Sequence, residues 1–423
     1  MDADPNHKKR TLWLCGALHA FTHIYHVALL PLYLRIQQDL KLGSVEQATL
    51  LVTVMGLAYC LPSYLLGVLA DRVSRKKLLA IGLAINGLGF VLLSFAPNYA
   101  WALAAVVVAG LGGSFYHPAA TALVAQLFPD HKGRALGLMG IGASAGFFIG
   151  PIYTGWRAVV SGSWRAPVLE LGLLGIIAAG LFAWLAEEER SSAPKTRPPA
   201  PEAKMFTSRA LWLFFIAASF TFSLRDFAGS GMGSLTSLFL QQAHGFNPKF
   251  TGLVLSGFFL AAAISNPLFG GLSDRGRKRW VSFVLLMAAA LMNVFPRVSE
   301  AWMVPVLLVY GFFFMSSYPM VEAALMDSVP DPVRGRVFGL FITVGGIAGN
   351  MAHWAVGSWV EQLGANAALS ASYHPLYGGL SVLVLLSLAG LPCLHAIRKR
   401  EHVDGASGGA ASPHSTLPSP DSP

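Results

Sequence analysis

Long apolar stretches recur along the whole chain and limit it to a membrane fold. A membrane-spanning helix needs about 20 mainly apolar residues to cross about 30 Å of hydrocarbon. Only 12% of the 423 residues are charged and 54% are hydrophobic, which excludes a soluble enzyme or an ordinary nucleic-acid-binding domain. We expect an all-α polytopic membrane protein, because a lone strand leaves its backbone unpaired in lipid. The twelve predicted transmembrane helices are 11–36, 46–70, 77–95, 99–127, 133–158, 166–187, 209–240, 249–272, 279–297, 301–327, 335–360 and 374–397.

The basic residues favour one side of these segments. With the N-terminus in the cytoplasm, 23 of the 30 Lys and Arg residues fall in cytoplasmic segments, 6 fall on the outer side, and Arg225 lies inside a span. An excess of Lys and Arg marks the cytoplasmic ends of spans. We therefore predict a multi-pass protein of a bacterial inner membrane with both termini in the cytoplasm. No small-residue cleavage site follows a short apolar region, so we expect no cleaved signal peptide.

Two features of the chain occur twice. GVLADRVSRKK begins at Gly67 and GGLSDRGRKRW begins at Gly270, and a second pair of stretches, beginning at Pro118 and Pro319, has nearly the same offset. This repetition predicts two parallel six-helix halves around a central cavity, with binding near the midplane. The predicted organisation is an N-terminal bundle over 1–187, a cytoplasmic linker over 188–208, a C-terminal bundle over 209–398 and a disordered tail over 399–423.

The first repeated feature resembles the loop signature of the major facilitator superfamily, G-x-L-a-D-r-x-G-r-k-x, with Ser74 where glycine is usual. The resemblance implies a pseudo-symmetric transporter that works by alternating access. It also implies that the aspartate holds the cytoplasmic helix ends together in the outward-facing state. Asp71 could pair with Arg134 or cap a helix; a mere topology signal is the alternative. The predicted gating residues are Gly67, Asp71, Arg72, Arg75, Arg134, Asp274, Arg275, Arg277 and Arg336.

A glycine-rich stretch in the fifth span resembles the antiporter signature of the same superfamily, which marks exporters more often than importers. Small residues permit close helix contact and a proline adds a kink; ordinary glycine packing is the alternative. The predicted helix-packing residues are Gly146, Gly150, Pro151 and Gly155. His19 and the stretch from Gly110 to Pro118 resemble the fosmidomycin-resistance branch, although His23 stands where that branch usually has an acid.

Arg225 and Asp226 fall near the middle of the seventh predicted span. A charge at this depth is unfavourable and marks a functional site by default. Adjacent helix positions point about 100° apart, so we expect each side chain to edge the cavity and find its own partner. Asp226 is the predicted proton carrier, and Arg225 could bind an anionic substrate group. A structural ion pair to a neighbouring helix is the alternative.

Three histidines in the first span, His19, His23 and His26, lie on one helical face by their i, i+4, i+7 spacing. Such a face can relay protons, hydrogen-bond a substrate or bind a metal, but nothing else resembles a metal centre, and we predict none. The three cysteines have no CxxC partner. The predicted proton-coupling residues are Asp226, His23 and Glu322, and the predicted substrate-binding residues are His19, His23, His26, Tyr25, His117, Arg225 and Tyr318.

These features predict a secondary transporter that exports a small organic molecule in exchange for protons. The chain has no Walker loop, GxSxG or HExxH motif, so we expect neither ATP drive, enzymatic activity nor a cofactor. Proton-coupled uptake of a small anionic metabolite is the alternative. A non-transporting membrane sensor and a membrane enzyme using the histidines are alternatives of other classes. The expected partners are the substrate, protons and the lipid bilayer, with no nucleic acid; the resemblance implies a monomer.

Overall fold

The computed structural model describes residues 5–70, 72–187, 205–329 and 333–408, and every regular element in these ranges is a helix. Eleven helical segments in these ranges are long and apolar enough to cross a membrane. The second predicted span adds a twelfth, in two shorter pieces that are broken at Leu61 and Pro62. The prediction of a twelve-helix membrane fold is confirmed.

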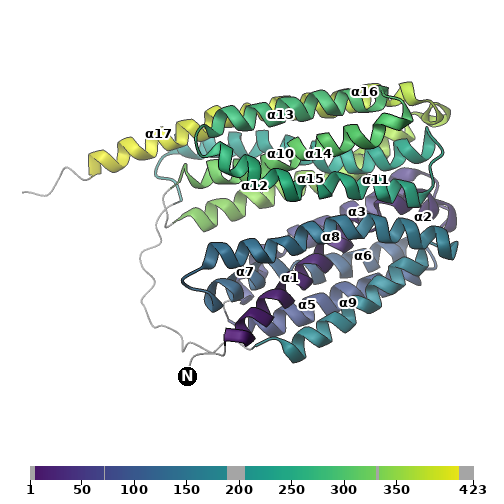
Figure 1. Cartoon of the computed structure of the whole chain (residues 1–423), viewed down its shortest axis with the longest axis horizontal. Helices are drawn as coiled ribbons and strands as arrows, with labels where there is room; N and C mark the ends of the chain where they lie inside the picture. Colours follow the sequence, from purple (N-terminus) through teal and green to yellow (C-terminus); the bar gives the residue numbers. More distant parts are fainter. Residues whose placement is uncertain (1–4, 71, 188–204, 330–332, 409–423) are drawn as a thin grey trace, which may run out of the picture.

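The first six spans form one bundle, and six further spans form the other (Figure 1). The first bundle consists of α1 (Pro5–Val27), η1 (Leu30–Leu32) and α2 (Tyr33–Asp39) as span one, α3 (Val45–Cys60) and α4 (Ser63–Ala70) as span two, α5 (Arg75–Ser94), α6 (Tyr99–Gly113) with α7 (Tyr116–Leu127), α8 (Lys132–Ser161) and α9 (Arg165–Leu185).

The second bundle begins at Arg209, after a predicted linker of which residues 188–204 lie outside the described ranges. It consists of α10 (Arg209–Gln242), α11 (Pro248–Leu260) with α12 (Ala262–Ser273), α13 (Arg277–Val294) with η2 (Phe295–Arg297), α14 (Glu300–Met326), α15 (Arg334–Glu361), η4 (Gly364–Ala368), η5 (Ser370–Tyr373), and α16 (His374–Ser387) with α17 (Gly390–Gly408). Helix α17 continues into the segment 399–423, for which composition predicts disorder; residues 409–423 lie outside the described ranges.

The break in span four, between α6 and α7, follows from one proline. Proline has no backbone N–H, so Pro118 cannot donate to the Ser114 carbonyl four residues earlier. Pro118 is tolerated because it lies in the first turn of α7, where backbone donors have no helical acceptor in any case. The new helix presents Tyr116 and His117 from its first turn, with Tyr116 buried in the first bundle and His117 exposed.

The two bundles meet at one end of the molecule and separate at the other (Figure 1). We call the end where α1 begins and α17 ends the basic end, and the opposite end the closed end. At the closed end, α3 and α15 are tied by hydrogen bonds. Thr53 Oγ1 donates to the Asn350 carbonyl at 2.8 Å, and Trp354 Nε1 donates to Glu46 at 2.6 Å. These bonds link the two halves directly.

Helices α8 and α11 also cross closely between the halves. A Cβ atom at Gly155 would overlap the Pro248 carbonyl, and one at Gly252 would overlap the Pro151 carbonyl. Only glycine permits such an approach of two backbones. Two further members of the antiporter-like stretch, Gly146 and Gly150, lie against α1 within the first bundle.

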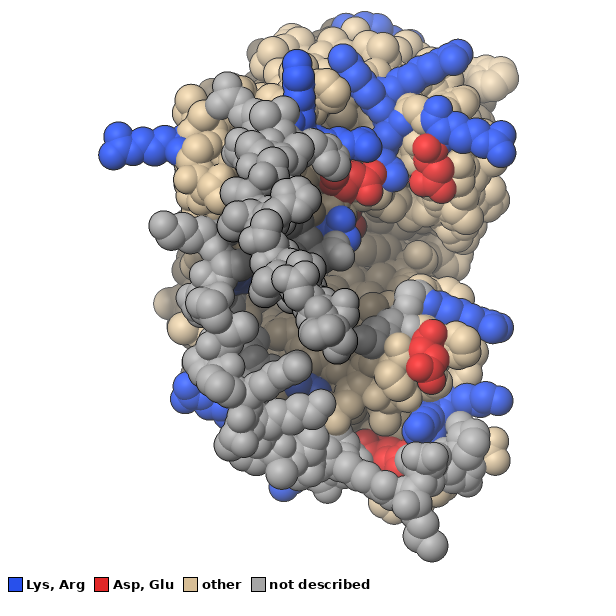
Figure 2. Space-filling model, turned by 90° about the vertical axis from the view of Figure 1, so that its left-hand side faces the viewer, with Lys and Arg blue, Asp and Glu red and all other residues tan. Residues whose placement is uncertain are grey.

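Viewed from the basic end, the molecule is hollowed between its two halves, with Lys and Arg side chains around the opening (Figure 2). The helices are therefore arranged around a cavity that is open at the basic end.

Candidate functional site

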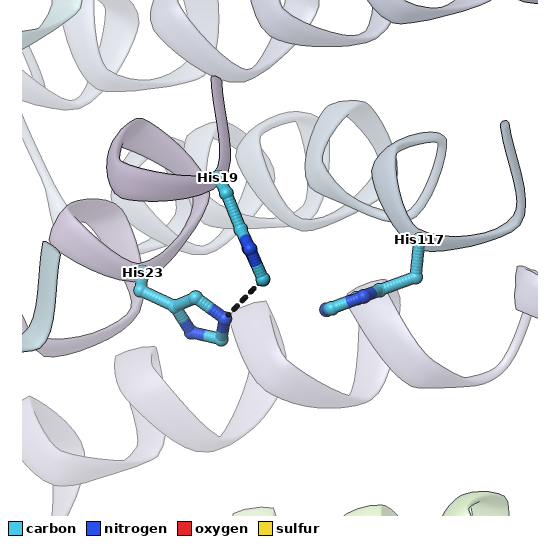
Figure 3. Close-up of side chains that lie close together, drawn as sticks. All are labelled: His19, His23 and His117. Atoms are coloured by element: carbon cyan, nitrogen blue, oxygen red, sulfur yellow. Dashed lines mark hydrogen bonds between the residues drawn. The ribbon is translucent and has the colours of Figure 1, made fainter. Parts of the chain in front are cut away.

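A cluster of three imidazoles lies in the first bundle (Figure 3). His19 and His23 come from successive turns of α1, and their Nε2 atoms are 3.2 Å apart. The His117 ring comes from α7 and has its centroid 5.2 Å from that of His19 and 5.9 Å from that of His23. We call these three residues the histidine triad. The sequence spacing of α1 predicts the first pair, whereas the third member depends on the break in span four.

A backbone contact fixes the orientation of His19. Its Nδ1 lies 3.1 Å from the Met139 carbonyl oxygen, and a carbonyl can only accept, so Nδ1 carries the hydrogen. In the neutral ring, Nε2 then has its lone pair directed toward His23. The rings of Tyr116 and Phe147 border the pair. His19 is buried, whereas His117 is exposed, so the triad reaches from the helix interface to the cavity.

Two other predicted binding residues of α1 lie elsewhere. His26 is one turn beyond His23 and contacts the Tyr59 ring at 5.9 Å between centroids. Tyr25 points away from the cavity, because it follows His23 by two positions and a helix turns about 200° over that interval. It is buried, and its hydroxyl donates to the Leu171 carbonyl of α9 at 2.8 Å. The assignment of Tyr25 to the cavity wall is therefore corrected: it packs inside the first bundle.

A second polar cluster, in the other bundle, is centred on Arg225 of α10. Both its Nε and its Nη2 donate to Asp226 Oδ1, at 3.0 and 2.7 Å, and the guanidinium stacks on the Tyr318 ring with 4.1 Å to the centroid. Only 2% of the Arg225 side chain is exposed, against 15% of Asp226. The expectation that these two residues find separate partners is wrong: the long arginine side chain folds back to its neighbour, and a buried guanidinium requires a counter-charge.

Glu322 completes this cluster. It follows Tyr318 by one turn of α14 and interacts electrostatically with both Arg225 and Asp226. The free carboxylate oxygen of Asp226, Oδ2, lies against Gly345 of α15, where a Cβ atom would overlap it. The second cluster therefore holds one buried cation and two acids between α10 and α14.

The second copy of the loop signature makes a small ion network at the basic end. Arg277 lies 3.0 Å from Asp327 Oδ2, at the end of α14, and 3.5 Å from Asp274 Oδ1. In the first copy, Arg75 Nη1 donates to Gln126 Oε1 at the end of α7, at 2.6 Å. The paired positions match by the sequence repeat. Gln126 and Asp327 are residues that motif reading alone misses, and the repeat offset is the signal that could have found them.

The remaining predicted gating residues are placed by their elements. Asp71 lies outside the described residues, so its pairing with Arg134 stays a prediction. The others lie at the basic end, in the helices or connections next to each signature: Gly67, Arg72, Arg134, Arg275 and Arg336.

At the closed end, a buried hydrogen-bonded chain links three helices of the two halves. The Tyr33 hydroxyl lies 2.8 Å from Ser234 Oγ, which lies 2.7 Å from His353 Nδ1. Next to it, Ser237 Oγ donates to the Leu30 carbonyl at 2.5 Å. The signal in the sequence that could have indicated this chain is the series Ser230, Ser234 and Ser237 within an apolar span. This hydrogen-bonded chain is separate from the two polar clusters described above, and it joins the two halves at the closed end.

The sequence model of the family described as the Major Facilitator Superfamily matches residues 12–353 of this chain. The chain therefore belongs to this family of transporters, which confirms the resemblance carried by the loop signatures. A chain of this class moves substrates across a membrane and is not an enzyme.

Several characterised proteins are similar over most of their length. The multi-drug resistance efflux pump PmrA of Streptococcus pneumoniae is 26% identical over 394 residues, covering 89% of this chain and 93% of that protein. The fosmidomycin resistance protein of Escherichia coli is 23% identical over 345 residues, covering 79% of this chain and 83% of that protein. The quinolone resistance protein NorA of Staphylococcus aureus is 24% identical over 372 residues, covering 86% of this chain and 90% of that protein.

Solved structures share the fold at low sequence identity. A bacterial homologue of the human lysosomal transporter Spinster, in an inward-facing and unoccupied conformation, has a TM-score of 0.73 and 16% identity, with 95% of this chain and 99% of that chain covered. The nucleoside transporter NupG has a TM-score of 0.71 and 16% identity, with 90% and 99% covered.

Proposed function

We propose that this protein exports a small organic molecule from the cytoplasm in exchange for protons, as a monomer in a bacterial inner membrane. The observation that carries the proposal is the Arg225–Asp226–Glu322 cluster in the middle of the second bundle. An intramembrane carboxylate is a proton-carrier candidate, because its protonation removes a charge from the membrane interior. The similarity to efflux and resistance proteins supports export as the direction.

The excess of Lys and Arg at the basic end supports a cytoplasmic position for that end. On this orientation the structure is the inward-facing state, since the cavity opens at the basic end. The seal between α3 and α15, the α8–α11 crossing and the Tyr33–Ser234–His353 chain close the outer side. Opening to the outside breaks these contacts and brings the two loop signatures together.

Coupling follows from the ion pair. When Asp226 takes up a proton, its attraction to Arg225 weakens, and the guanidinium is left with Tyr318 and Glu322. The cluster then favours a different packing of α10 against α14, which biases the two-state equilibrium of the halves. Substrate and proton compete because both change the charge balance of the same cavity. In the present state Arg225 is covered by Asp226 and Tyr318, so an anionic substrate meets no free guanidinium there.

The test uses everted membrane vesicles with a preformed acid-inside pH gradient, reported by a quenched fluorescent amine. Cationic drugs, siderophores, organic acids and sugars are added in turn. We expect at least one compound to restore fluorescence with the wild type. Asp226→Asn should lower that rate by about 100-fold or more, since positioned proton-transfer groups contribute about 10²–10⁴-fold.

Asp39→Asn is the matched control, because Asp39 pairs with Arg165 at the closed end, away from the cavity; its rate should stay near that of the wild type. Expression and monodispersity are measured for both variants. If a compound restores fluorescence equally fast with the wild type and with a well-folded Asp226→Asn variant, Asp226 has no role in proton coupling.

A further inference from the structure

We propose that the histidine triad is a binding site for a divalent transition-metal ion of the Zn²⁺ class, with one coordination position open to the cavity. The inference concerns binding and does not depend on the direction of transport. Among the described residues, this is the one group of three or more His, Cys, Asp or Glu whose donor atoms all lie within 4.8 Å of one another.

The first argument is the spacing of the donors. Zn–N bonds of 2.0–2.1 Å in a tetrahedral site put two ligand nitrogens about 3.3 Å apart. The Nε2 atoms of His19 and His23 are 3.2 Å apart, so one ion fits between them with little change in either ring. His117 reaches toward the pair from α7 (Figure 3). One of its ring nitrogens already lies within 4.8 Å of a ring nitrogen of each partner, and its exposed side chain leaves room for the movement that completes the set.

The second argument is the orientation of His19. Metal-binding histidines almost always donate their other ring N–H to a carbonyl, carboxylate or water, which fixes the tautomer and aims the lone pair. The contact of His19 Nδ1 with the Met139 carbonyl, at 3.1 Å, is of this kind. This carbonyl belongs to α8, so the site is held by three helices.

In the metal-free cluster a proton lies where the ion would bind. Since Nδ1 of His19 is the donor to Met139, the short Nε2–Nε2 contact requires the hydrogen on His23 Nε2. Metal binding moves that hydrogen to Nδ1 of the same ring, so Nε2 becomes free to bind the ion and the ring stays neutral. No oxidation or reduction is involved.

The ligand set defines the class of ion. Imidazole nitrogen suits Zn²⁺, Cu²⁺ and Ni²⁺, whereas Mg²⁺ and Ca²⁺ prefer oxygen. Three neutral imidazoles leave the charge of the ion uncompensated, and the fourth position faces the cavity beside His117. Water, hydroxide or an anionic group of a molecule in the cavity would occupy it. The site therefore suits either a metal ion or an organic chelate of one.

The experiment measures metal binding by the purified full-length protein in lipid nanodiscs, after removal of any polyhistidine tag. Zn²⁺ is titrated in competition with a chromophoric chelator, and Co²⁺ is followed by visible absorption, because tetrahedral Co²⁺ absorbs much more strongly than six-coordinate Co²⁺. We expect one Zn²⁺ per chain and a tetrahedral Co²⁺ spectrum. His23→Gln and His117→Gln should each weaken Zn²⁺ binding by more than about tenfold, since loss of even an outer-shell partner costs 10–100-fold.

His395→Gln is the matched control, because His395 is exposed on α17, far along the chain from the triad, and its affinity should equal that of the wild type. His117→Gln keeps the test decisive if the His23 variant does not fold, since His117 is not part of the core. Zn²⁺ binding that is equally strong in the wild type and in a folded His117→Gln variant, or a wild type with no binding of one ion per chain, would overturn the proposal. Either result leaves the export assay unaffected.

Discussion

Replacing Arg225 with alanine is expected to lower the free energy of unfolding by about 3–5 kcal/mol and to abolish transport. This is the range for removing one partner of a buried ion pair, because the remaining charge stays buried without compensation. In this protein Asp226 Oδ1 would lose the two hydrogen bonds that it accepts from Nε and Nη2 of Arg225. The Tyr318 ring would also lose the guanidinium stacked on it.

The measurement is the apparent melting temperature of the purified protein in detergent, together with the vesicle assay. Arg157→Ala is the matched control, because Arg157 pairs with Glu170 at a site where about a quarter of its side chain is exposed (26%). Exposed pairs contribute little to stability, so the control should melt much closer to the wild type.

A double variant, Arg225→Met with Asp226→Leu, separates stability from function. Replacing both members of a buried pair by apolar residues is often neutral or stabilising, so the double variant should recover the melting temperature. Transport should remain absent, since the proton-binding carboxylate is gone. If the double variant exports at the wild-type rate, the pair is structural and the proposed coupling role fails.

Replacing Gly155 with leucine is expected to shift the two halves toward the outward-open state. A side chain at this position would overlap the Pro248 carbonyl in the closed crossing of α8 and α11. Overpacking of this kind costs about 1–3 kcal/mol, which corresponds to a change of about 5- to 150-fold in the ratio of the two states. Leucine in the equivalent place on the partner helix, Gly252, should act in the same direction.

The readout is the distance distribution between spin labels at Lys77 and Lys278, one on each half at the basic end and both exposed, in a cysteine-free background. The wild type should show the longer distances of the inward-open state, and Gly155→Leu should shift the population to shorter ones. Gly180→Leu is the control, because a Cβ at Gly180 meets open space. Equal distributions in all three proteins would show that the crossing does not control opening.

Hydrophobicity and charge were sufficient for the topology. Each span must be an apolar helix of nearly fixed length, so the twelve segments could be found without knowing which helices touch. The loop signatures at Gly67 and Gly270 recur by sequence alone, and they predicted two similar halves. Arg225 and Asp226 were found for the same reason, since a charge in an apolar span stands out whatever its partners are.

Contacts between helices could not be predicted in this way, because they depend on how each helix is rotated about its axis and packed against its neighbours. Spacing along one helix does not encode this. The i, i+4 rule paired His19 with His23, but it could not bring in His117, which comes from another helix after a proline break. The same rule did not show that Tyr25 packs inside the first bundle, where its hydroxyl donates to the Leu171 carbonyl of α9.

The number and the repetition of the spans therefore follow from the sequence, through the energetics of placing each residue in lipid or water. Which end is closed and which is open became clear from the packing of the two bundles (Figure 1). The tertiary structure also paired Arg225 with Asp226 and brought the three imidazoles together. The first of these features depends on small differences in packing between two halves that have more than one stable arrangement, whereas the ion pair and the triad depend on side-chain contacts within one half.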